Sequence, residues 1–458
     1  MKVVIINSPL FREKNELYDE DSLPPIGLGL IATNLKINNI NVELIDAVHL
    51  RIPLITLIET LNLTKPDFIA SNIFTTNFEL VKDLVEGINY KAHFIIGGLS
   101  TKQLYKKIIQ WETTNQIDVV TGDGEIITLD IVKNQINETP FIDTQNNRRV
   151  FIINEKSLYF VKDISNVPLN RDFFLNEPIN HPLGFLEANI VTSRGCVYNC
   201  TFCAAARSLN TEFPIREKSE LSIIMDLMGI KNKYPEVKSI RVLDDLFLKS
   251  KYSLQKAINV FSKFDYQWRS MAHVMTFNNV EETLLESLKK SGCNELFIGI
   301  ESGSSKILQS INKTKNIDTI LNNLTNVFKA GINIKGYFIY GFPEETSYDM
   351  EMTYRLAEKL KILSLQHNVN FRTSVFQFRP YHSSQIYHDL EVNGLDLNVQ
   401  QIQPNSKLSS LIGRLQFNFH SGNYSKVESS KIHDYIYRTI NLNDGKIFGG
   451  LESEIKST

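Results

Sequence analysis

The chain has 458 residues, which is enough for two or three domains. Hydrophobic residues make up 42% and charged residues 22%, and the formal net charge is −2. This composition lacks the overall basic field that attracts nucleic acid or anionic membranes, so we expect neither as a partner. The first apolar run covers only residues 3–6, and no stretch approaches the ~20 apolar residues of a membrane span. We therefore expect a cytoplasmic protein.

The first 140 residues alternate between short β-branched runs and helical patterns. Strands are predicted at 2–7, 41–46, 67–72, 93–98 and 118–123, and helices at 27–38, 54–61, 79–88, 104–111 and 125–132. This alternation predicts an α/β fold, a doubly wound, Rossmann-like domain with a parallel sheet covered on both faces. Ligands of such sheets bind beyond the carboxyl ends of the strands, where the sequence has Gly97, Gly98, Gly122 and Glu125.

Residues 141–184 are polar and broken, and we interpret them as a connector that wraps between domains. A second alternating block covers residues 185–390, with strands predicted at 186–193, 239–244, 267–273, 295–301, 333–340 and 372–379. Helical patterns lie at 220–232, 252–264, 281–291, 304–311, 317–330 and 347–362. Six strand–helix units predict a partial barrel, whose functional loops follow the strands. Residues 391–458 predict a small helical appendage.

Three of the four cysteines, Cys196, Cys200 and Cys203, lie within eight residues directly after the first strand of the second block. In a reducing compartment, a metal site accounts for this cluster better than a disulfide does. Iron–sulfur clusters are held by cysteine thiolates, usually four. Three thiolates on a four-iron cube would leave one iron open, as a catalytic metal requires.

The cysteine spacing alone leaves two alternatives to an iron–sulfur cluster. A zinc site is one, although zinc usually takes four ligands in two pairs, and the nearest histidine in sequence, His181, lies in the connector. Three core cysteines grouped by chance are the second. The fourth cysteine, Cys293, stands where a helical pattern gives way to a strand and is interpreted as a buried core residue.

The segment "RGCVYNCTFC" (194–203) resembles the CxxxCxxC signature of the radical SAM superfamily. The resemblance implies that Cys196, Cys200 and Cys203 bind a [4Fe–4S] cluster. S-adenosylmethionine (SAM) would then chelate the open iron, and reduction would cleave it to a 5′-deoxyadenosyl radical. It further implies that Phe202 packs near the adenine of SAM.

Four later segments resemble motifs of the same superfamily, in the same order. "RVLDDLFL" (241–248) implies that Asp244 and Asp245 approach the amino group of SAM, and "FIGIESGS" (297–304) implies that Glu301 contacts SAM. "GYFIYGFPEET" (336–346) resembles the fifth-strand motif, where Gly341 would let the backbone approach the cofactor, and "FQFRPYHSSQIY" (376–387) resembles the exit of the sixth strand. Taken singly, the two aspartates could cap a helix and Gly341 could form a turn.

The first 140 residues resemble the cobalamin-binding domain of one radical SAM subgroup, the class B methylases. The matching segments are 23–36, 42–47, 95–98 and 119–125. No DxHxxG motif is present, and His49 has the wrong spacing for a cobalt ligand, so the resemblance implies cobalamin without a histidine on cobalt. The loop with Phe74, Thr75 and Thr76 would face cobalt instead. The alternative is that this domain has lost cobalamin and only shapes the active site.

The family resemblance implies cobalamin-dependent methylation of an unactivated carbon in a small-molecule or peptide substrate. An external donor such as flavodoxin or ferredoxin would supply the electron. The alternatives are a radical rearrangement, oxidation or ring contraction with cobalamin as a spectator or absent, and a non-catalytic iron–sulfur or corrinoid-binding protein. The methylthiotransferase relatives use three further N-terminal cysteines, which this chain lacks. Candidates for the substrate pocket are His273, Arg379, Tyr381 and His382.

Overall fold

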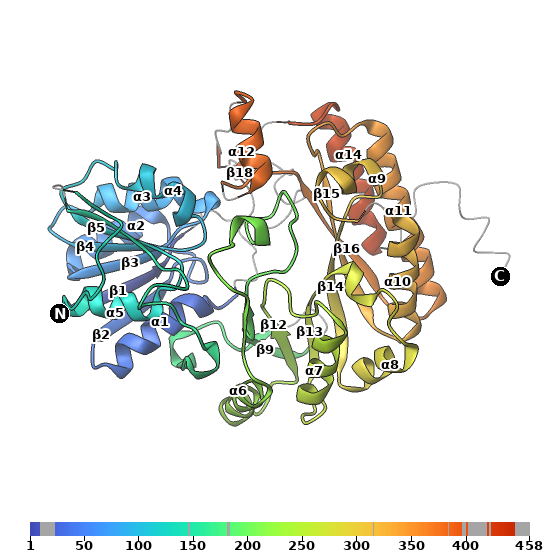
Figure 1. The fold of residues 1–458 in the computed structure, drawn as a ribbon, viewed down its shortest axis with the longest axis horizontal. Coiled ribbons are helices and arrows are strands. Elements are labelled where there is room, and N and C mark those ends of the chain that lie inside the picture. Colours follow the sequence, from blue (N-terminus) through green and yellow to red (C-terminus); the bar gives the residue numbers. More distant parts are fainter. Residues whose placement is uncertain are drawn as a thin grey trace.

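The structure is a computed structural model, and it describes residues 1–9, 23–144, 147–180, 184–314, 316–382, 384–395, 400–401, 419–420 and 423–444. Two sheets of seven strands lie side by side, each with its own hydrophobic core (Figure 1). We call them the N-terminal sheet and the barrel sheet. Both consist mainly of parallel strands that alternate with helices, which confirms the predicted α/β fold class.

The N-terminal sheet has the strand order β2-β1-β3-β4-β5-β7-β6, in which only β6 is antiparallel to its neighbour. Its strands are β1 (Lys2–Asn7), β2 (Asn41–Asp46), β3 (Phe68–Asn72), β4 (His93–Gly97), β5 (Gln116–Thr121), β6 (Ile142–Thr144) and β7 (Arg148–Ile152). Its helices are α1 (Ile26–Ile37), α2 (Leu54–Thr64), α3 (Phe78–Gly87), α4 (Thr101–Ile108) and α5 (Glu125–Lys133).

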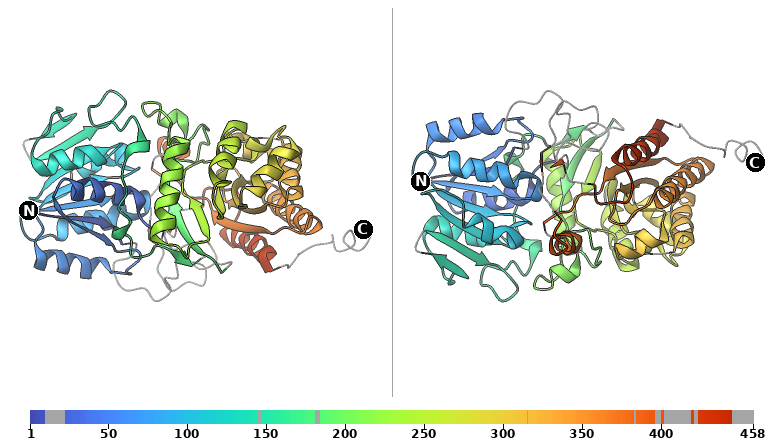
Figure 2. Two further views of the ribbon diagram at one scale, coloured as in Figure 1. Left: turned by 90° about the horizontal axis from the view of Figure 1, so that it is seen from below. Right: turned by 90° about the horizontal axis from the view of Figure 1, so that it is seen from above.

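Helices cover both faces of the N-terminal sheet. One core joins α1 and α5 to alternate strand residues such as Val3 and Ile5, and the other joins α2, α3 and α4 to Val4 and Ile6 (Figure 2). Because neither face is solvated, the strands consist of continuous β-branched and apolar runs. This arrangement leaves the carboxyl ends of the strands as the place for a ligand.

The predicted connector contains strands that belong to both sheets. The β6–β7 hairpin extends the N-terminal sheet through the parallel pairing of β7 with β5. The short strand β8 (Ile179–Asn180) pairs antiparallel with β9 and so extends the barrel sheet. The sequence pattern missed these strands because they are short, and β6 and β8 lie at the edges of their sheets. The division of the chain into domains stays a prediction.

The barrel sheet has the order β16-β15-β14-β13-β12-β9-β8, with six parallel strands as predicted. These strands are β9 (Leu186–Ile190), β12 (Ser239–Val242), β13 (Gln267–Ala272), β14 (Cys293–Glu301), β15 (Asn333–Tyr340) and β16 (Phe371–Gln377). The helices are α6 (Glu220–Lys233), α7 (Lys251–Phe261), α8 (Glu282–Lys290), α9 (Ser305–Ser310), α10 (Ile317–Lys329) and α11 (Ser347–Gln366). They pack on the convex face in one large core, and the concave face is left for polar residues.

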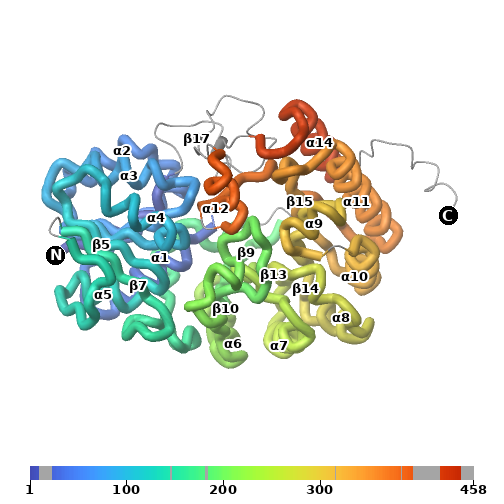
Figure 3. Tube along the Cα trace, turned by 45° about the horizontal axis from the view of Figure 1, so that its top comes forward, coloured from blue at the N-terminus to red at the C-terminus, as the bar shows by residue number. Residues whose placement is uncertain are grey.

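The C-terminal part does not stand apart from the barrel. Helix α14 (Ser429–Asn441) packs against α11 and β16, and Tyr340 of β15 shares a hydrogen bond of 2.7 Å with Thr439. Helix α12 (Gln385–Val392) lies near the junction of the two sheets (Figure 3). The remaining described elements here are β17 (Gln400–Gln401) and β18 (Phe419–His420), and most of the predicted appendage lies outside the described residues. None of the described helices is both long and apolar enough for a membrane span.

Candidate active site

The three clustered cysteines lie in one loop, residues 195–206, which we call the cysteine loop. It follows β9 and the short strand β10 (Ser193–Arg194), which pairs with β11 (Arg216–Glu217). Inside the loop the amide of Cys203 donates to the carbonyl of Cys200 at 3.1 Å. The amide of Thr201 donates to Ile311, and the side chain of Asn312 donates to the carbonyl of Asn199. The loop is therefore fastened to the end of α9.

Asp244, just after β12, positions the start of the cysteine loop. Its carboxylate accepts hydrogen bonds from the amide and hydroxyl of Thr192, both at 2.6 Å, and from the hydroxyl of Ser193 at 2.7 Å. The Asp244 side chain is buried. These three hydrogen bonds offset the free-energy cost of burying a carboxylate away from water. The neighbouring Asp245 keeps exposed surface beside the loop. Of the predicted pair, Asp245 is thus the better placed to meet a ligand.

The cysteines are half-buried, whereas Cys293 is fully buried at the start of β14. Among the described residues, no three His, Cys, Asp or Glu side chains converge so that they could hold a metal ion. A tetrahedral zinc site needs such convergence. A four-iron cube instead takes its thiolates at separate corners, so the donor set of three thiols on one anchored loop fits that cluster.

Glu301 forms a buried ion pair beside the cysteine loop. Its carboxylate accepts from Lys313 at 2.6 Å, and both side chains are less than a tenth exposed. The strand β14 is irregular here, since the pairing register shifts between Gly299 and Glu301. A Cβ at Gly299 would lie 2.2 Å from the Glu301 carboxylate and 2.7 Å from the Lys313 ammonium. The glycine therefore makes room for the ion pair, which the sequence pattern did not predict.

A cavity of about 450 Å³ opens on the concave face of the barrel sheet, and we call it the barrel cavity. Phe202 of the cysteine loop lines it and packs edge-on against Phe342, with ring centroids 5.8 Å apart. Glu301 lines it as well, together with Arg379 and Tyr381 from the predicted substrate residues. The cavity thus brings the cysteine loop and the strand ends together.

The predicted residues His273 and Gly341 do not line this cavity. His273 stacks on Tyr198 of the cysteine loop, with ring centroids 3.7 Å apart. Burial, together with the charge of Lys313, lowers the pKa of His273 to about 3, so the ring is neutral near pH 7. Gly341 has a positive φ of 93° and does not itself line the cavity, although a Cβ added there would lie 3.7 Å from Gln377, which does.

A second cavity, of about 520 Å³, lies at the carboxyl edge of the N-terminal sheet, and we call it the strand-edge cavity. Its lining includes five predicted residues, namely Phe74, Gly97, Gly98, Gly122 and Glu125. The other wall comes from the barrel side, through Arg194, Asn210, Phe213 and Arg216. Among the described residues that line it there is no histidine. His49 instead lies in the turn after β2, where its amide donates to Asp46.

The predicted loop of Phe74, Thr75 and Thr76 reaches the barrel side of the junction. The hydroxyl of Thr75 accepts from the amide of His382 at 3.1 Å and contacts its ring nitrogen at the same distance. His382 directly follows Tyr381, which lines the barrel cavity, whereas Phe74 lines the strand-edge cavity. The loop therefore lies between the two cavities. Thr76 is half-buried and lines neither cavity.

Partly buried ion pairs join the N-terminal sheet to the segments on either side of the cysteine loop. Arg194 donates to Asp123 at 2.8 Å and also pairs with Glu125, while Arg216 pairs with Asp123. Arg194 stands directly before Gly195 and Cys196, so these contacts tie the end of β5 to the start of the cysteine loop. The carboxylate of Glu125, a predicted cofactor residue, is thus engaged by an arginine. Only the tertiary structure could pair residues so far apart in the sequence.

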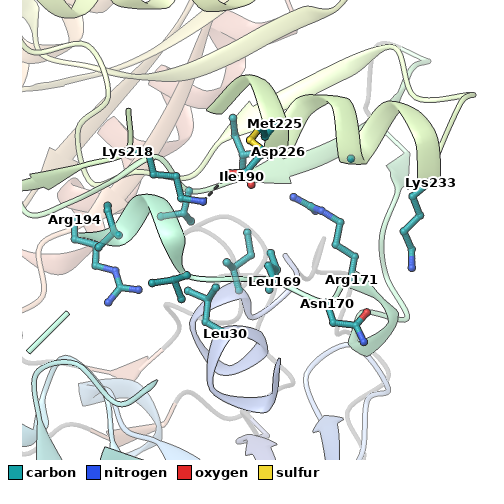
Figure 4. A pocket seen from close by; sticks show the side chains of 15 residues that line it. Leu30, Leu169, Asn170, Arg171, Ile190, Arg194, Lys218, Met225, Asp226 and Lys233 are labelled. Carbon is teal, nitrogen blue, oxygen red and sulfur yellow. Dashed lines mark hydrogen bonds and ion pairs between the residues drawn. The ribbon is translucent and has the colours of Figure 1, made fainter. Parts of the chain in front are cut away.

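A third cavity, of about 280 Å³, lies between α1, α6 and residues 164–171 (Figure 4). Its basic side chains have acidic partners. Lys218 pairs with Asp226 at 2.6 Å, and Arg171 pairs with Glu177 at 2.5 Å. Lys233 pairs with Asp172, and Arg194 with Asp123. With its charges compensated in this way, we interpret this cavity as a packing gap between elements.

Comparison with known proteins agrees with this geometry. Residues 190–357 match the family model described as the radical SAM superfamily. An uncharacterized methyltransferase of Pyrococcus horikoshii is 25% identical over 350 residues, which is 74% of each chain. A putative methylthiotransferase of Methanocaldococcus jannaschii is 26% identical over 358 residues, 71% of this chain and 70% of the relative.

Among solved structures, the fold is similar to that of the cobalamin-dependent S-adenosylmethionine radical enzyme OxsB, which was determined with aqua-cobalamin and S-adenosylmethionine bound. The TM-score is 0.64 and the identity 16%. The similarity covers 97% of this chain and 66% of that one, so OxsB is about half as long again.

Proposed function

We propose that the chain is a radical SAM enzyme with a cobalamin-binding-type domain and that it methylates an unactivated carbon with cobalamin as the methyl carrier. Its substrate would be a small molecule or a peptide, and a flavodoxin or ferredoxin would supply electrons. One observation carries the proposal: the loop at Phe74 and Thr75 separates a cavity beside the cysteine loop from a cavity at the sheet edge.

The residues present fit the three groups that the reaction needs. Cys196, Cys200 and Cys203 would hold the iron–sulfur cluster, and Phe202, Asp245 and Glu301 would contact SAM. Gly97, Gly98 and Gly122 would line the cobalamin site with backbone, without a histidine on cobalt. When bound, the cluster supplies the electron that cleaves SAM, and cobalamin supplies a transferable methyl group.

The chain's own residues would position the cofactors and exclude water from them. The hydrogen bonds of Asp244 and Arg194 hold the cysteine loop against both sheets. These contacts would fix the position of the barrel cavity relative to the strand-edge cavity. The aromatic lining near Phe202 excludes water from the place where a reactive radical would form. Neutral His273 and the Glu301–Lys313 pair add no net charge beside the thiolates.

Methylthio transfer, the activity named for the Methanocaldococcus relative, is the competing function. It would need a second cluster, and the chain has four cysteines in all. Cys293 is fully buried in the barrel core, so after the cysteine loop is counted no thiol remains near the N-terminal sheet. The cysteine inventory thus favours methylation.

The test is anaerobic reconstitution with iron, sulfide and cobalamin, followed by reduction with methyl-labelled SAM. We expect four irons per chain, bound corrinoid absorbance and label on the corrinoid. With substrate, label in a product heavier by one methylene would support methylation. A protein that releases 5′-deoxyadenosine but binds no corrinoid would instead carry out a radical rearrangement or oxidation. A protein that cleaves no SAM even with substrate would be a binding protein.

A further inference from the structure

His273, directly after β13, carries a buried hydrogen-bond donor. It caps the short 3-10 helix Val274–Phe277, where its Nδ1 accepts from the amide of Met275 at 3.2 Å. A ring nitrogen that accepts a hydrogen bond carries no proton, so the proton of this imidazole is on Nε2. His273 is 7% exposed, and its Nε2 has no hydrogen-bond partner among the residues that the structure describes.

The surrounding residues hold the His273 ring in place without using this donor. The ring stacks on that of Tyr198, with the two planes 17° apart, and the Met275 contact fixes its rotation. The helix that follows is anchored as well, since Asn323 donates to the carbonyl of Val274 at 3.0 Å. A buried N–H without an acceptor costs free energy and is rare in native structures. A donor that is fixed in this way indicates that its acceptor belongs to a bound group.

The His273 ring lies against the cysteine loop. Tyr198, on which it stacks with ring centroids 3.7 Å apart, stands between Cys196 and Cys200 in the chain. Burial lowers the pKa of His273, and the charge of Lys313 adds to this effect. The same charge opposes the rise that burial causes in the pKa of the Cys200 thiol. The imidazole and a predicted cluster ligand therefore lie near one ammonium group.

SAM is the less suitable acceptor, because His273 lies outside the barrel cavity. The described residues that line this cavity include Phe202 and Glu301, two of the predicted SAM contacts, but neither His273 nor any of the three clustered cysteines. Tyr198 is also absent from the described lining. The imidazole and the thiols thus share a part of the site that the cavity does not include. The acceptors that the proposed cofactors would bring to that part are the sulfur atoms of the cluster.

We propose that the Nε2–H of His273 donates a hydrogen bond to a sulfur atom of the iron–sulfur cluster, a sulfide or a cysteine thiolate, and so makes the cluster easier to reduce. This inference rests on the proposed function, because it needs the cluster at the three cysteines. Hydrogen bonds to the sulfurs are one of the means by which a protein sets the reduction potential of such a cluster. The donor stabilises the more negative, reduced cluster more than the oxidised one, so the potential rises. The electron itself still comes from the flavodoxin or ferredoxin.

Two substitutions separate the roles of the two ring nitrogens. In H273N, the amide oxygen can still accept from Met275, but no donor remains at the position of Nε2. In H273Q, the amide nitrogen takes about the position of the histidine Nε2 and can donate, whereas the cap is lost. The matched control is H367N, because His367 follows α11 and precedes β16, at the opposite end of the strands from the cysteine loop.

The measurement is the midpoint reduction potential of the reconstituted full chain, followed by electron paramagnetic resonance without SAM and then with SAM. H273N should lower the equilibrium constant for reduction about tenfold, which is about 59 mV for one electron. H273Q should shift the potential by less than half as much, and H367N should not shift it. Thermal unfolding of the iron-free chain should give the opposite order, with H273Q less stable than H273N, because only H273Q loses the cap.

Three results would overturn the proposal. They are an unchanged potential in H273N, an equal shift in H273N and H273Q, and a shift that appears only when SAM is present. The equal shift would mean that the ring only supports the loop, and the shift with SAM would mean that Nε2 donates to SAM. Iron content and circular dichroism check that each variant is loaded and folded.

The outcomes separate this inference from the proposed function. If H273N lowers the potential but no methyl label reaches the corrinoid, the methylation proposal fails and the role of His273 stands. If label reaches the corrinoid but the potential of H273N is unchanged, only the role of His273 is overturned. Native protein that takes up no iron overturns both, and iron analysis shows this before any potential is measured.

Discussion

The two sheets have the same number of strands but use their faces differently. In the N-terminal sheet helices cover both faces, and a strand such as β1 buries four consecutive apolar residues, Val3–Ile6. In the barrel sheet helices cover only the convex face. Along β14, Leu296, Ile298 and Ile300 join the core, whereas Glu295 and Phe297 face inward. Strand periodicity therefore indicates which sheet has an uncovered face where charged groups can meet a ligand.

The largest expected effect on this comparison of the two sheets comes from the cysteine loop, which lies at the uncovered, concave face of the barrel sheet. Changing any one of Cys196, Cys200 or Cys203 to alanine should abolish 5′-deoxyadenosine formation and lower the iron content, because each supplies a thiolate of the cluster. Iron analysis and chromatographic detection of 5′-deoxyadenosine are the measurements.

C293A is the matched control for the cysteine variants, since Cys293 belongs to the covered, convex-side core. It should keep its iron and its SAM cleavage and lose only about 1 kcal/mol of unfolding free energy. Loss of iron in C293A would show that the cluster has a fourth cysteine ligand and would contradict the open iron.

The next largest effect concerns a buried ion pair of the barrel sheet, in which Arg269 donates to both oxygens of Glu187. E187Q leaves Arg269, which is 9% exposed, with a weakened partner, and should cost about 3 kcal/mol of unfolding free energy. D118N is the counterpart in the N-terminal sheet, where Arg149 pairs with Asp118 but is 21% exposed. We expect D118N to cost about half as much. Urea unfolding of both variants measures the two losses of unfolding free energy. Equal losses would mean that the two ion pairs are equally shielded from solvent.

An effect of similar size, which depends on pH, is expected from Glu345 in the turn after β15. Burial raises the pKa of Glu345 to about 8, although the amides of Gly341 and Phe342 donate to its carboxylate. Its Oε1 has no hydrogen-bond partner among the described residues, which fits a protonated carboxyl. Between about pH 4.5 and pH 8 the folded protein therefore keeps a proton that the unfolded chain releases.

Stability should consequently fall as pH rises through this window, by on the order of 3 kcal/mol from this group alone. E345Q keeps an oxygen for both amides but cannot ionise. It should flatten the dependence of unfolding free energy on pH between about pH 5 and pH 8. An unchanged pH profile in E345Q would mean that Glu345 is ionised at neutral pH.

The smallest effect is expected at the edge of the N-terminal sheet. Gly98 has a φ of 107°, and a Cβ there would lie 2.8 Å from the backbone N and O of Ile73. G98A should therefore cost about 1–3 kcal/mol and should also reduce corrinoid binding, because the strained segment lines the strand-edge cavity. Corrinoid absorbance and thermal unfolding are the readouts. G394A, at an exposed turn with positive φ and no neighbour within 4 Å, is the control for backbone strain alone.

Sequence reasoning predicted the parts of the site that depend on local pattern. The cysteine spacing, the strand-end glycines and the six parallel strands of the barrel all come from short motifs or from strand–helix alternation. It missed the β6–β7 hairpin and β8, which are too short for such a pattern to detect. It also gave no sign that Asp244, a predicted SAM contact, accepts hydrogen bonds from Thr192, and the contact of Asp244 with SAM stays a prediction. A carboxylate in a motif does not reveal which groups surround it.

The sequence alone determined the fold class, the loop with the thiols and the family, because hydrophobic periodicity and ligand spacing are local properties of a chain. Only the tertiary structure decided which charges lie together. Glu301 meets Lys313, Asp123 meets Arg194 from the barrel side, and Glu187 meets Arg269. These contacts depend on where separate strands end and how the sheets face each other, and Coulomb energies change steeply with such distances.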